Sequence, residues 1–296
     1  MTTPSLPASL WHALDRRPPL RLSPIGADRG RSASLLRAVW PDGFSAIVKI
    51  SRDRQRGARE QEALAHIDSP HVPALLGSAS EDDRIVLLLE DLSACAHGDI
   101  LAGVSAETAR SMLRVLGQLH AHPAPGGWPR GVPRWREVSE GDIAAFLDRY
   151  PHPWAVARLR SLPTAVETFQ PVLAGLDVGL AHADAHLDNW MFRDAPVLID
   201  WETARVAPPE VDVVRVLMEG VHTDVRRAAG DTLLAAWAEG AGRAGLEGLQ
   251  AAAWYSINAM LPHHAHIDLA SLSPRMLDVH RRCAGQAMAL AEDLGL

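Results

Sequence analysis

The sequence predicts an α+β fold with two lobes, a small mixed N-terminal lobe and a larger, mainly helical C-terminal lobe. Two observations support this prediction. Several segments with strand character and one helical segment precede residue 90. From about residue 104 onward the segments have helical spacing, apart from one compact non-helical block at 179–202. A chain of 296 residues is long enough for one large domain or for two lobes with a substantial core.

The N-terminal lobe is expected to begin with strands. "RLSPI", a loop at Gly26–Gly30 and "ASLLRAVW" lead through the turn "PDG" at 41–43 into "FSAIVKI", an order typical of a hairpin. Residues 55–67 then have helical spacing, with Leu64 and Ile67 on one side. The strongly apolar segment "DRIVLLLEDLS" predicts a further strand that ends in acidic residues.

The C-terminal lobe is expected to begin with a helix capped by Ser105, in which Leu113, Leu116 and Leu119 recur near helical spacing. A loop rich in proline, glycine and tryptophan follows at 123–136. Further helical stretches are predicted at 140–149, 153–175, 210–220, 224–243, 246–261 and 274–293.

Composition excludes several classes of function. The formal charge is -7 and no basic stripe stands out, so we expect neither nucleic acid nor a membrane surface as a partner, and no obligate protein partner is indicated. Cys95 and Cys283 form no metal-type pair and no disulfide framework. Without a secretory signal or an apolar run long enough to span a bilayer, a cytoplasmic location is expected.

Lys49 is the only lysine among 29 basic residues, and Asn189 and Asn258 are the only asparagines. A GC-rich coding bias explains the depletion but not where the remaining residues lie. Arginine replaces lysine well on a surface, but it does not replace it where a compact point charge is needed. Lys49 is therefore a candidate for chemistry, and a strand-end surface lysine is the alternative.

The block at 179–202 reads "GLAHADAHLDNWMFRDAPVLIDWE" and carries His182, Asp184, Asn189 and Asp200. Phosphoryl transfer needs an oriented acceptor and metal ions that neutralise the transferring group. A carboxylate can accept the proton of a hydroxyl, whereas an amide oxygen and a second carboxylate offer the hard ligands that magnesium prefers. The spacing matches the catalytic loop and metal-binding aspartate of protein kinases, without their arginine and their Phe-Gly.

"HADAHLDN" with "LIDWE" resembles the aminoglycoside phosphotransferase and choline kinase-like family of small-molecule kinases. "AIVKI", "REQEAL", "LLLEDLS" and "PEVDVVRVL" follow in the expected order, so the resemblance covers nearly the whole chain. It implies a bilobal, protein-kinase-like fold. Residues 1–90 would form the nucleotide-binding lobe, 91–97 the hinge and 98–296 the catalytic and substrate-binding lobe.

The resemblance also implies roles for single residues. Lys49 would contact the α- and β-phosphates of ATP (or GTP), oriented by Glu60, for which Glu62 is the rival. Asp184 would be the catalytic base. The remaining roles are loop bracing by His182 and Asp212, Mg²⁺ binding by Asn189 and Asp200, and adenine binding by the Glu90 carbonyl and the Leu92 amide.

Two departures from the family pattern concern the backbone. Ala183 stands where the family usually has glycine, which puts the geometry of the catalytic loop in question. The loop that contains Gly26 and Gly30 is less glycine-rich than that of a protein kinase, but it can still cap the phosphates with backbone N–H groups, helped by Ser32. Simple turn residues are the alternative for both glycines.

Other interpretations stay open. His182, Asp184 and His186 form a string that can ligate zinc, as in a metal hydrolase. His263, His264 and His266 are more typical of a solvated loop than of a metal site. Trp201 and Glu202 are candidate substrate residues, although Glu202 is equally expected in a structural salt bridge. Tryptophans in the positions of Trp128, Trp135 and Trp154 are more often packing residues than pocket residues.

The function predicted from the sequence is transfer of the ATP γ-phosphate to a hydroxyl of a small molecule. An antibiotic is the favoured acceptor, on the weak ground that the arginine-rich composition fits an antibiotic producer or its neighbours. The alternatives are a kinase of a primary metabolite such as choline or a sugar, and a nucleotide-binding pseudokinase. The intact set of Lys49, Asp184, Asn189 and Asp200 argues against the pseudokinase.

Overall fold

The computed structural model describes residues 6, 11, 17–25, 33–81, 84–133, 135–243 and 246–296. The chain forms two compact units, which are described one at a time. The first unit comprises Met1–His97 and Met191–Ala204, and the second comprises Gly98–Trp190 and Arg205–Leu296. Residues 191–204, which the sequence-based boundaries assigned to the C-terminal lobe, are thus grouped with the N-terminal segment.

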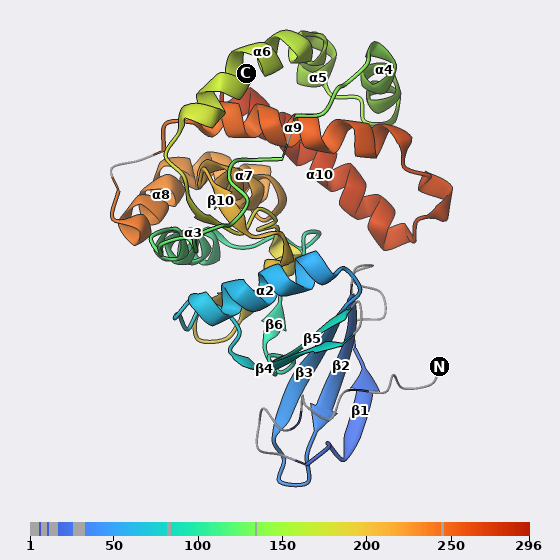
Figure 1. Cartoon of the computed structure of the whole chain (residues 1–296). Coiled ribbons are helices and arrows are strands. Elements are labelled where there is room, and N and C mark those ends of the chain that lie inside the picture. Colours follow the sequence, from blue (N-terminus) through green and yellow to red (C-terminus); the bar gives the residue numbers. More distant parts are fainter. Residues whose placement is uncertain are drawn as a thin grey trace. The chain divides into compact units, whose positions relative to one another are not determined.

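The first unit is built on a five-stranded antiparallel sheet with the order β1-β2-β3-β5-β4 (Figure 1). The strands are β1 (Arg21–Pro24), β2 (Ala33–Val39), β3 (Ser45–Ser51), β4 (Leu75–Glu81) and β5 (Arg84–Glu90). The predicted hairpin is confirmed. Gly43 takes a positive φ of 85° in its turn, and the Asp42 carboxylate accepts a hydrogen bond from the Phe44 N–H.

Helix α2 (Arg54–His66) and a second, smaller sheet complete the first unit. The Asp53 carboxylate caps α2 by accepting hydrogen bonds from the backbone N–H groups of Gln55 and Arg56. The helix packs against the 3₁₀ turn η3 (Trp201–Thr203). The smaller sheet has the order β6-β8-β9, with β6 (Ala96–His97), β8 (Trp190–Phe192) and β9 (Pro196–Leu198). The segment after the predicted catalytic loop therefore packs close to α2.

The second unit is mainly helical (Figure 1). Its helices are α3 (Ala106–His120), α4 (Glu140–Arg149), α5 (Pro153–Arg158), α6 (Leu162–Gly175), α7 (Glu210–Glu219), α8 (Thr223–Ala241), α9 (Leu249–His266) and α10 (Pro274–Asp293), with 3₁₀ turns η1 (Leu159–Ser161), η2 (Leu187–Asn189) and η4 (Leu269–Ser271). The Ser105 cap is confirmed, because its hydroxyl accepts from the Thr108 N–H at 3.1 Å. Helix α3 packs along α8, and α9 contacts α4, α6, α7 and α10.

The single helix predicted over 153–175 is wrong, because η1 separates α5 from α6. Pro163 lies at the start of α6. A proline has no N–H to donate, so it fits the first turn of a new helix, where that N–H would have no partner, better than the middle of a long one.

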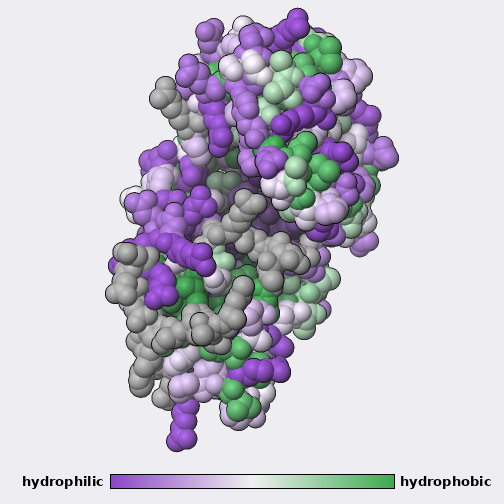
Figure 2. Space-filling model, turned by 90° about the vertical axis from the view of Figure 1, so that its right-hand side faces the viewer, coloured by the Kyte–Doolittle hydropathy of each residue, from purple (hydrophilic) through white to green (hydrophobic). Residues whose placement is uncertain are grey.

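A two-stranded antiparallel sheet lies among these helices, and its first strand leads directly into the predicted catalytic loop. Strand β7 (Gly179–Ala181) pairs with β10 (Arg205–Ala207), which places Arg205 opposite Ala181. On the face shown in Figure 2, hydrophobic residues form small surface patches separated by hydrophilic residues. Among the described residues no helix combines the length and the apolar character that a membrane span requires.

Candidate active site

Lys49 lies at the centre of a buried ionic group in the first unit. It comes from β3, and its ammonium Nζ is 2.6 Å from Glu60 Oε2 on α2 and 2.6 Å from Asp200 Oδ1. The Lys49 residue is only 6% exposed. Of the two glutamates that the sequence offered, the structure brings Glu60 onto the lysine.

The charges in this group shift one another's ionisation. Burial alone would lower the pKa of Lys49, but the carboxylates of Glu60 and Asp200 outweigh burial and raise it above its usual value. Burial raises the pKa of Glu60 to about 7, against the opposing effect of the lysine charge. Lys49 therefore stays charged, as its predicted contact with phosphates requires.

Trp201 and Glu202, the candidate substrate residues, are both buried. The Trp201 indole N–H donates to the Leu198 carbonyl at 2.9 Å. Arg56 donates to Glu202 Oε1 at 3.0 Å, and Glu202 Oε2 is 3.9 Å from Lys49. These contacts favour packing for the tryptophan and the salt-bridge interpretation for the glutamate, while a role toward substrate stays a prediction.

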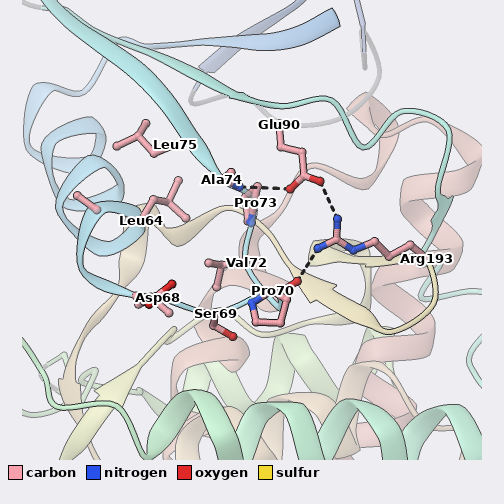
Figure 3. A pocket seen from close by; sticks show the side chains of 12 residues that line it. Leu64, Asp68, Ser69, Pro70, Val72, Pro73, Ala74, Leu75, Glu90 and Arg193 are labelled. Carbon is pink, nitrogen blue, oxygen red and sulfur yellow. Dashed lines mark hydrogen bonds and ion pairs between the residues drawn. The ribbon is translucent and has the colours of Figure 1, made fainter. Parts of the chain in front are cut away.

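The segment predicted to bind adenine lies at the end of β5. The side chain of Glu90 accepts from Arg193 at 2.6 Å and from the Ala74 N–H at 3.3 Å, and Arg193 also donates to the Pro70 carbonyl (Figure 3). Glu90 and Arg193, together with the chain that follows α2, line a hollow of about 530 Å³. Leu92 is buried against Met191 and Val197. The adenine contacts themselves stay a prediction.

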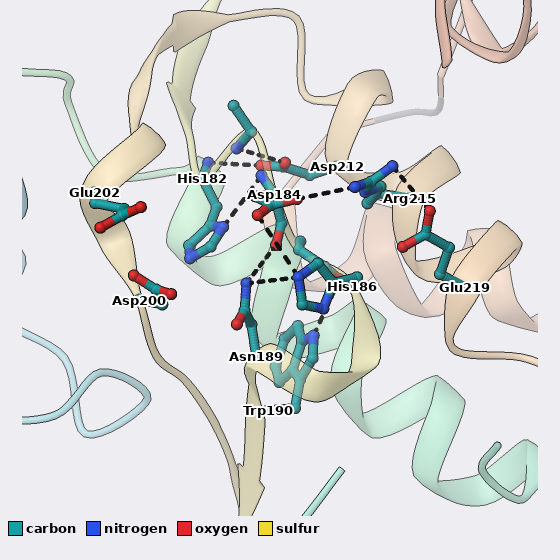
Figure 4. Close-up of polar contacts among 12 residues, drawn as sticks. His182, Asp184, His186, Asn189, Trp190, Asp200, Glu202, Asp212, Arg215 and Glu219 are labelled. Carbon is teal, nitrogen blue, oxygen red and sulfur yellow. Dashed lines mark hydrogen bonds and ion pairs between the residues drawn. The ribbon is translucent and has the colours of Figure 1, made fainter. Parts of the chain in front are cut away.

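The predicted catalytic loop follows β7 in the second unit. Asn189 Nδ2 donates to the Asp184 carbonyl at 2.8 Å, and the Asp184 N–H donates to His182 Nδ1 at 3.2 Å (Figure 4). His182 is buried, whereas the Asp184 side chain is 34% exposed. The loop thus holds its own shape through internal bonds and leaves the Asp184 carboxylate accessible.

Asp212 at the start of α7 fixes the backbone of this loop. Its carboxylate is fully buried and accepts the N–H groups of His182 and Ala183, each at 2.7 Å. Ala183 has a φ of 64°, a left-handed conformation that costs a residue with a Cβ roughly 1–2 kcal/mol. That conformation explains why glycine is usual there, and the two short bonds to a carboxylate offset its cost.

Two residues of α7 that sequence reasoning missed complete the surroundings of Asp184. Arg215 donates to Asp184 Oδ1 at 3.0 Å and pairs with Glu219 at 2.8 Å (Figure 4). Desolvation opposes ionisation of Asp184, but His186, whose Nε2 is 3.6 Å away, and the charge of Arg215 outweigh it and hold the pKa of Asp184 far below its usual range. The Asp184 carboxylate, the predicted base, is therefore ionised and oriented at neutral pH.

A buried relay behind Asp212 was also missed. His120 on α3 donates from Nε2 to Asp212 at 3.1 Å, and its Nδ1 accepts from the Trp237 indole N–H of α8 at 3.0 Å. The indole fixes this tautomer, because it can only donate. The one available signal was the position of His120 at the end of an amphipathic helix, which does not reveal its partner.

The donor atoms suit the metal that the resemblance implies. Asn189 uses its amide nitrogen for the Asp184 carbonyl, which leaves Oδ1 as a possible ligand. The Asp200 carboxylate is 38% exposed, and Lys49 contacts its Oδ1. Both are hard oxygen donors of the kind that hold Mg²⁺. Asn189 belongs to the second unit and Asp200 to the first, so their shared role stays a prediction.

Within the described part of the chain, one set of ligand atoms lies within 4.8 Å, namely Glu60, Asp200 and Glu202. His182, Asp184 and His186 do not form such a set there, which argues against the zinc alternative. His263, His264 and His266 lie in the last turns of α9 rather than in a loop, and His264 is buried, so the solvated-loop interpretation is wrong for it. Gly26, Gly30 and Ser32 lie outside the described residues.

Comparison with known proteins places the chain in a family. Solved structures that resemble it include the choline kinase LicA from Streptococcus pneumoniae (16% identity, TM-score 0.57, covering 90% of this chain and 93% of that one). Another is the macrolide 2'-phosphotransferase MphH from Brachybacterium faecium (20% identity, TM-score 0.52, covering 90% of this chain and 91% of that one). Among curated proteins, no match was found. The model of the "Phosphotransferase enzyme family" matches residues 23–255, and the chain therefore belongs to that family.

Proposed function

We propose that this chain transfers the γ-phosphate of ATP to a hydroxyl group of a small molecule, with an antibiotic as the favoured acceptor. The observation that carries the proposal is the accessible, ionised carboxylate of Asp184 on a loop whose backbone is held by Asp212. Relatives of the same fold that act on macrolides support the antibiotic, and the choline kinase keeps a primary metabolite as the alternative.

Each group has a defined task in this reaction. Lys49 neutralises the nucleotide phosphates, and Glu60 keeps the ammonium in place. Mg²⁺, held by Asn189 and Asp200, would supply charge neutralisation on the transferring group. Asp184 has a low pKa and is therefore a weak base. It accepts a hydrogen bond from the acceptor hydroxyl, orients it, and takes its proton as the bond to phosphorus forms.

The variant Asp184→Asn tests this assignment. It keeps the size of the side chain but removes the charge and the proton acceptor, so kcat should fall by roughly 10²–10⁴-fold while ATP binds as before. ATP-dependent product formation, confirmed by the mass of one added phosphate, and nucleotide titration measure the two effects. Asp177→Asn is the matched control, because the Asp177 side chain is 87% exposed. Near-normal turnover in Asp184→Asn would refute the base assignment.

A broad acceptor screen separates the enzyme from a nucleotide-binding module. Hydroxyl-bearing antibiotics and common metabolites would be incubated with ATP and Mg²⁺, and phosphorylated products sought by mass. Bound nucleotide with no phosphorylated product across that panel would favour the pseudokinase.

A further inference from the structure

Two buried histidines face each other where helices α9 and α10 pack together in the second unit. His264 on α9 is 6% exposed and His280 on α10 is 7% exposed. His264 Nε2 lies 3.1 Å from His280 Nδ1, and the other nitrogen of His264, Nδ1, donates to the Met260 carbonyl at 3.1 Å. Because a carbonyl can only accept, this bond fixes the tautomer of His264, and Nε2 presents a lone pair to His280.

The neighbours of His264 hold its ring in place. Phe146 on α4 and Tyr150 at the end of that helix meet the His264 ring edge-on, with centroids 6.4 Å and 5.6 Å away. Arg149 donates to the carbonyls of His264 and Ile267, at 3.2 Å and 2.7 Å, and so fixes the backbone at the end of α9. The Nε2 lone pair of His264 therefore has a defined direction before any ligand binds.

A third imidazole, that of His263, lies beside this pair. Its ring centroid is 5.4 Å from that of His280 and 5.6 Å from that of His264, while the centroids of His264 and His280 are 4.7 Å apart. His263 is exposed, whereas the other two rings are buried. A ligand from solvent would thus approach the histidine pair from the side of His263.

These separations match those of imidazoles around one transition-metal ion. Two nitrogens that each lie about 2.0–2.1 Å from a tetrahedral Zn²⁺ are about 3.3 Å apart, and the centroids of their rings are about 5 Å apart. The nitrogens of His264 and His280 are close to the first value, and all three pairs of rings are close to the second.

His263 has to turn its ring to complete such a set, because the nitrogens of the three histidines do not all lie within 4.8 Å of one another in the structure. Rotation about the Cβ–Cγ bond is a soft torsion in histidine and leaves the ring centroid in place. It can therefore redirect a nitrogen of His263 toward the pair. His280 needs only a change of tautomer, in which its proton moves from Nδ1 to Nε2 of the same ring.

We propose that His263, His264 and His280 form a binding site for Zn²⁺, which links the end of α9 to α10. Imidazole nitrogens favour zinc, copper and nickel, whereas the oxygen ligands predicted for Mg²⁺ favour hard ions, so the two kinds of site take different metals. The Nδ1–H bond of His264 to the Met260 carbonyl is the outer contact that usually orients a zinc-binding histidine. A water molecule would complete the four ligands.

The bound ion would stabilise the fold rather than take part in phosphoryl transfer. An ion that binds the folded chain and not the unfolded one raises stability by mass action. Here it would join two helices that are consecutive in sequence and packed against each other. The inference therefore stands or falls independently of the proposed function.

Metal titration of the untagged, metal-free protein in excess Mg²⁺ tests the site. Co²⁺ serves as a visible probe for Zn²⁺, because tetrahedral coordination by nitrogen gives a strong absorption band that oxygen sites do not give. We expect one Co²⁺ to bind per chain and Zn²⁺ to displace it. The melting temperature should rise by about 5 °C at a Zn²⁺ concentration about a hundredfold above Kd. Neither readout requires ATP or an acceptor.

Variants identify the ligands. His280→Asn should abolish the Co²⁺ band and the rise in melting temperature, and His263→Asn should weaken Co²⁺ binding by about tenfold or more. His66→Asn is the matched control, because His66 is an exposed histidine in the last turn of α2, in the first unit. His266→Asn separates the three histidines from the neighbouring contact between His266 and Asp142.

A Co²⁺ band that is unchanged in His280→Asn or in His263→Asn would overturn the site. So would a band that is lost in His266→Asn, since the ion would then be bound by the His266–Asp142 pair. The titration of the unaltered protein decides the question even if a variant misfolds, because the absence of a tetrahedral Co²⁺ band there would refute the proposal.

Discussion

Lys49 shows how a single residue can be singled out by composition and then tested by contacts. The chain uses arginine for all its other basic side chains, so the retained lysine indicates a place that arginine does not fit. In the structure its ammonium lies 2.6 Å from two carboxylates and is almost fully buried. A planar guanidinium is larger and cannot approach both oxygens from the same point.

Lys49→Arg should therefore lower kcat/KM by about 100-fold or more, through misplaced charge at the phosphates. Steady-state ATP turnover measures the effect, and a thermal melt shows whether the fold survives. The reverse exchange nearby, Arg56→Lys, is the matched control, since the Arg56 side chain is 48% exposed and should tolerate the change. Full activity in Lys49→Arg would refute the inference that position 49 requires lysine. The assignment of Asp184 as the base would still stand as a prediction.

Other residues of the site were not foreseeable in the same way. Glu60 could be preferred to Glu62 because it places Leu64 and Ile67 at the apolar spacing of the family that the sequence resembles. Arg215 and Glu219 are one turn apart on α7, but the contact of Arg215 with Asp184 depends on how α7 packs against the loop. Such a contact follows from tertiary structure, which spacing along one helix does not contain.

Among the secondary-structure elements, α7 holds the predicted catalytic loop through several direct contacts. Asp212 in its first turn receives two backbone N–H groups of the loop and the His120 imidazole, which in turn accepts from Trp237. Helices α3, α7 and α8 are therefore connected to the loop through one carboxylate. The bond to the His182 N–H is buried and the other three are partly buried, so losing any of them weakens the solvent-shielded network around Asp212.

Asp212→Asn should destabilise the protein by about 3 kcal/mol, because a neutral amide cannot accept the two N–H groups as strongly and presents its own donor to one of them. Chemical denaturation followed by tryptophan fluorescence measures the loss. Trp237→Phe, which removes only the outermost donor of the relay, should weaken stability less. If Asp212→Asn cost no more than an average surface substitution, the carboxylate would not be what holds the left-handed Ala183.

Local signals predicted the elements better than their ends. The "PDG" turn and the Ser105 cap have direct backbone causes, and both are confirmed. The single helix over 153–175 was wrong because the 3₁₀ turn η1 (Leu159–Ser161) interrupts it just before α6 begins. Helix α9 extends to His266, beyond the predicted end at residue 261, although Pro262 lies inside it. Tertiary packing against α4 and α10 outweighs that local signal.

At the scale of the whole molecule, the pattern of strands followed by helices was sufficient to predict the α+β class. It was not sufficient to place residues 191–204, which follow the catalytic loop in sequence but group with the N-terminal segment. The pairing of β6 with β8, and the Lys49–Asp200 ion pair, join parts of the chain that are distant in sequence. No local periodicity predicts such partners.

The stability of the molecule should depend on pH through His264 in the packed end of α9. Its Nδ1–H donates to the Met260 carbonyl, and its Nε2 accepts from the Nδ1–H of His280 at 3.1 Å, so the ring is held neutral. Burial, with the charge of His280 adding to it, lowers the pKa of His264 to about 3. The unfolded chain binds the proton near the usual value of about 6.5.

Because the pKa of His264 is lower in the folded state, the stabilisation of the fold by neutral His264 is complete above about pH 6.5. This stabilisation is lost progressively as the pH falls toward 3. At pH 5 the free energy of unfolding should therefore be about 2 kcal/mol smaller than at pH 8 on account of His264. Urea titrations of the unaltered protein and of His264→Asn, which keeps a donor for Met260 but does not ionise, report the contribution of the His264–His280 pair, because titrating groups away from this pair cancel in the difference. The pH slope should be shallower in the variant. Equal pH slopes would mean that His264 is protonated in the folded state as readily as in the unfolded chain. The interior at the end of α9 would then tolerate a positive charge.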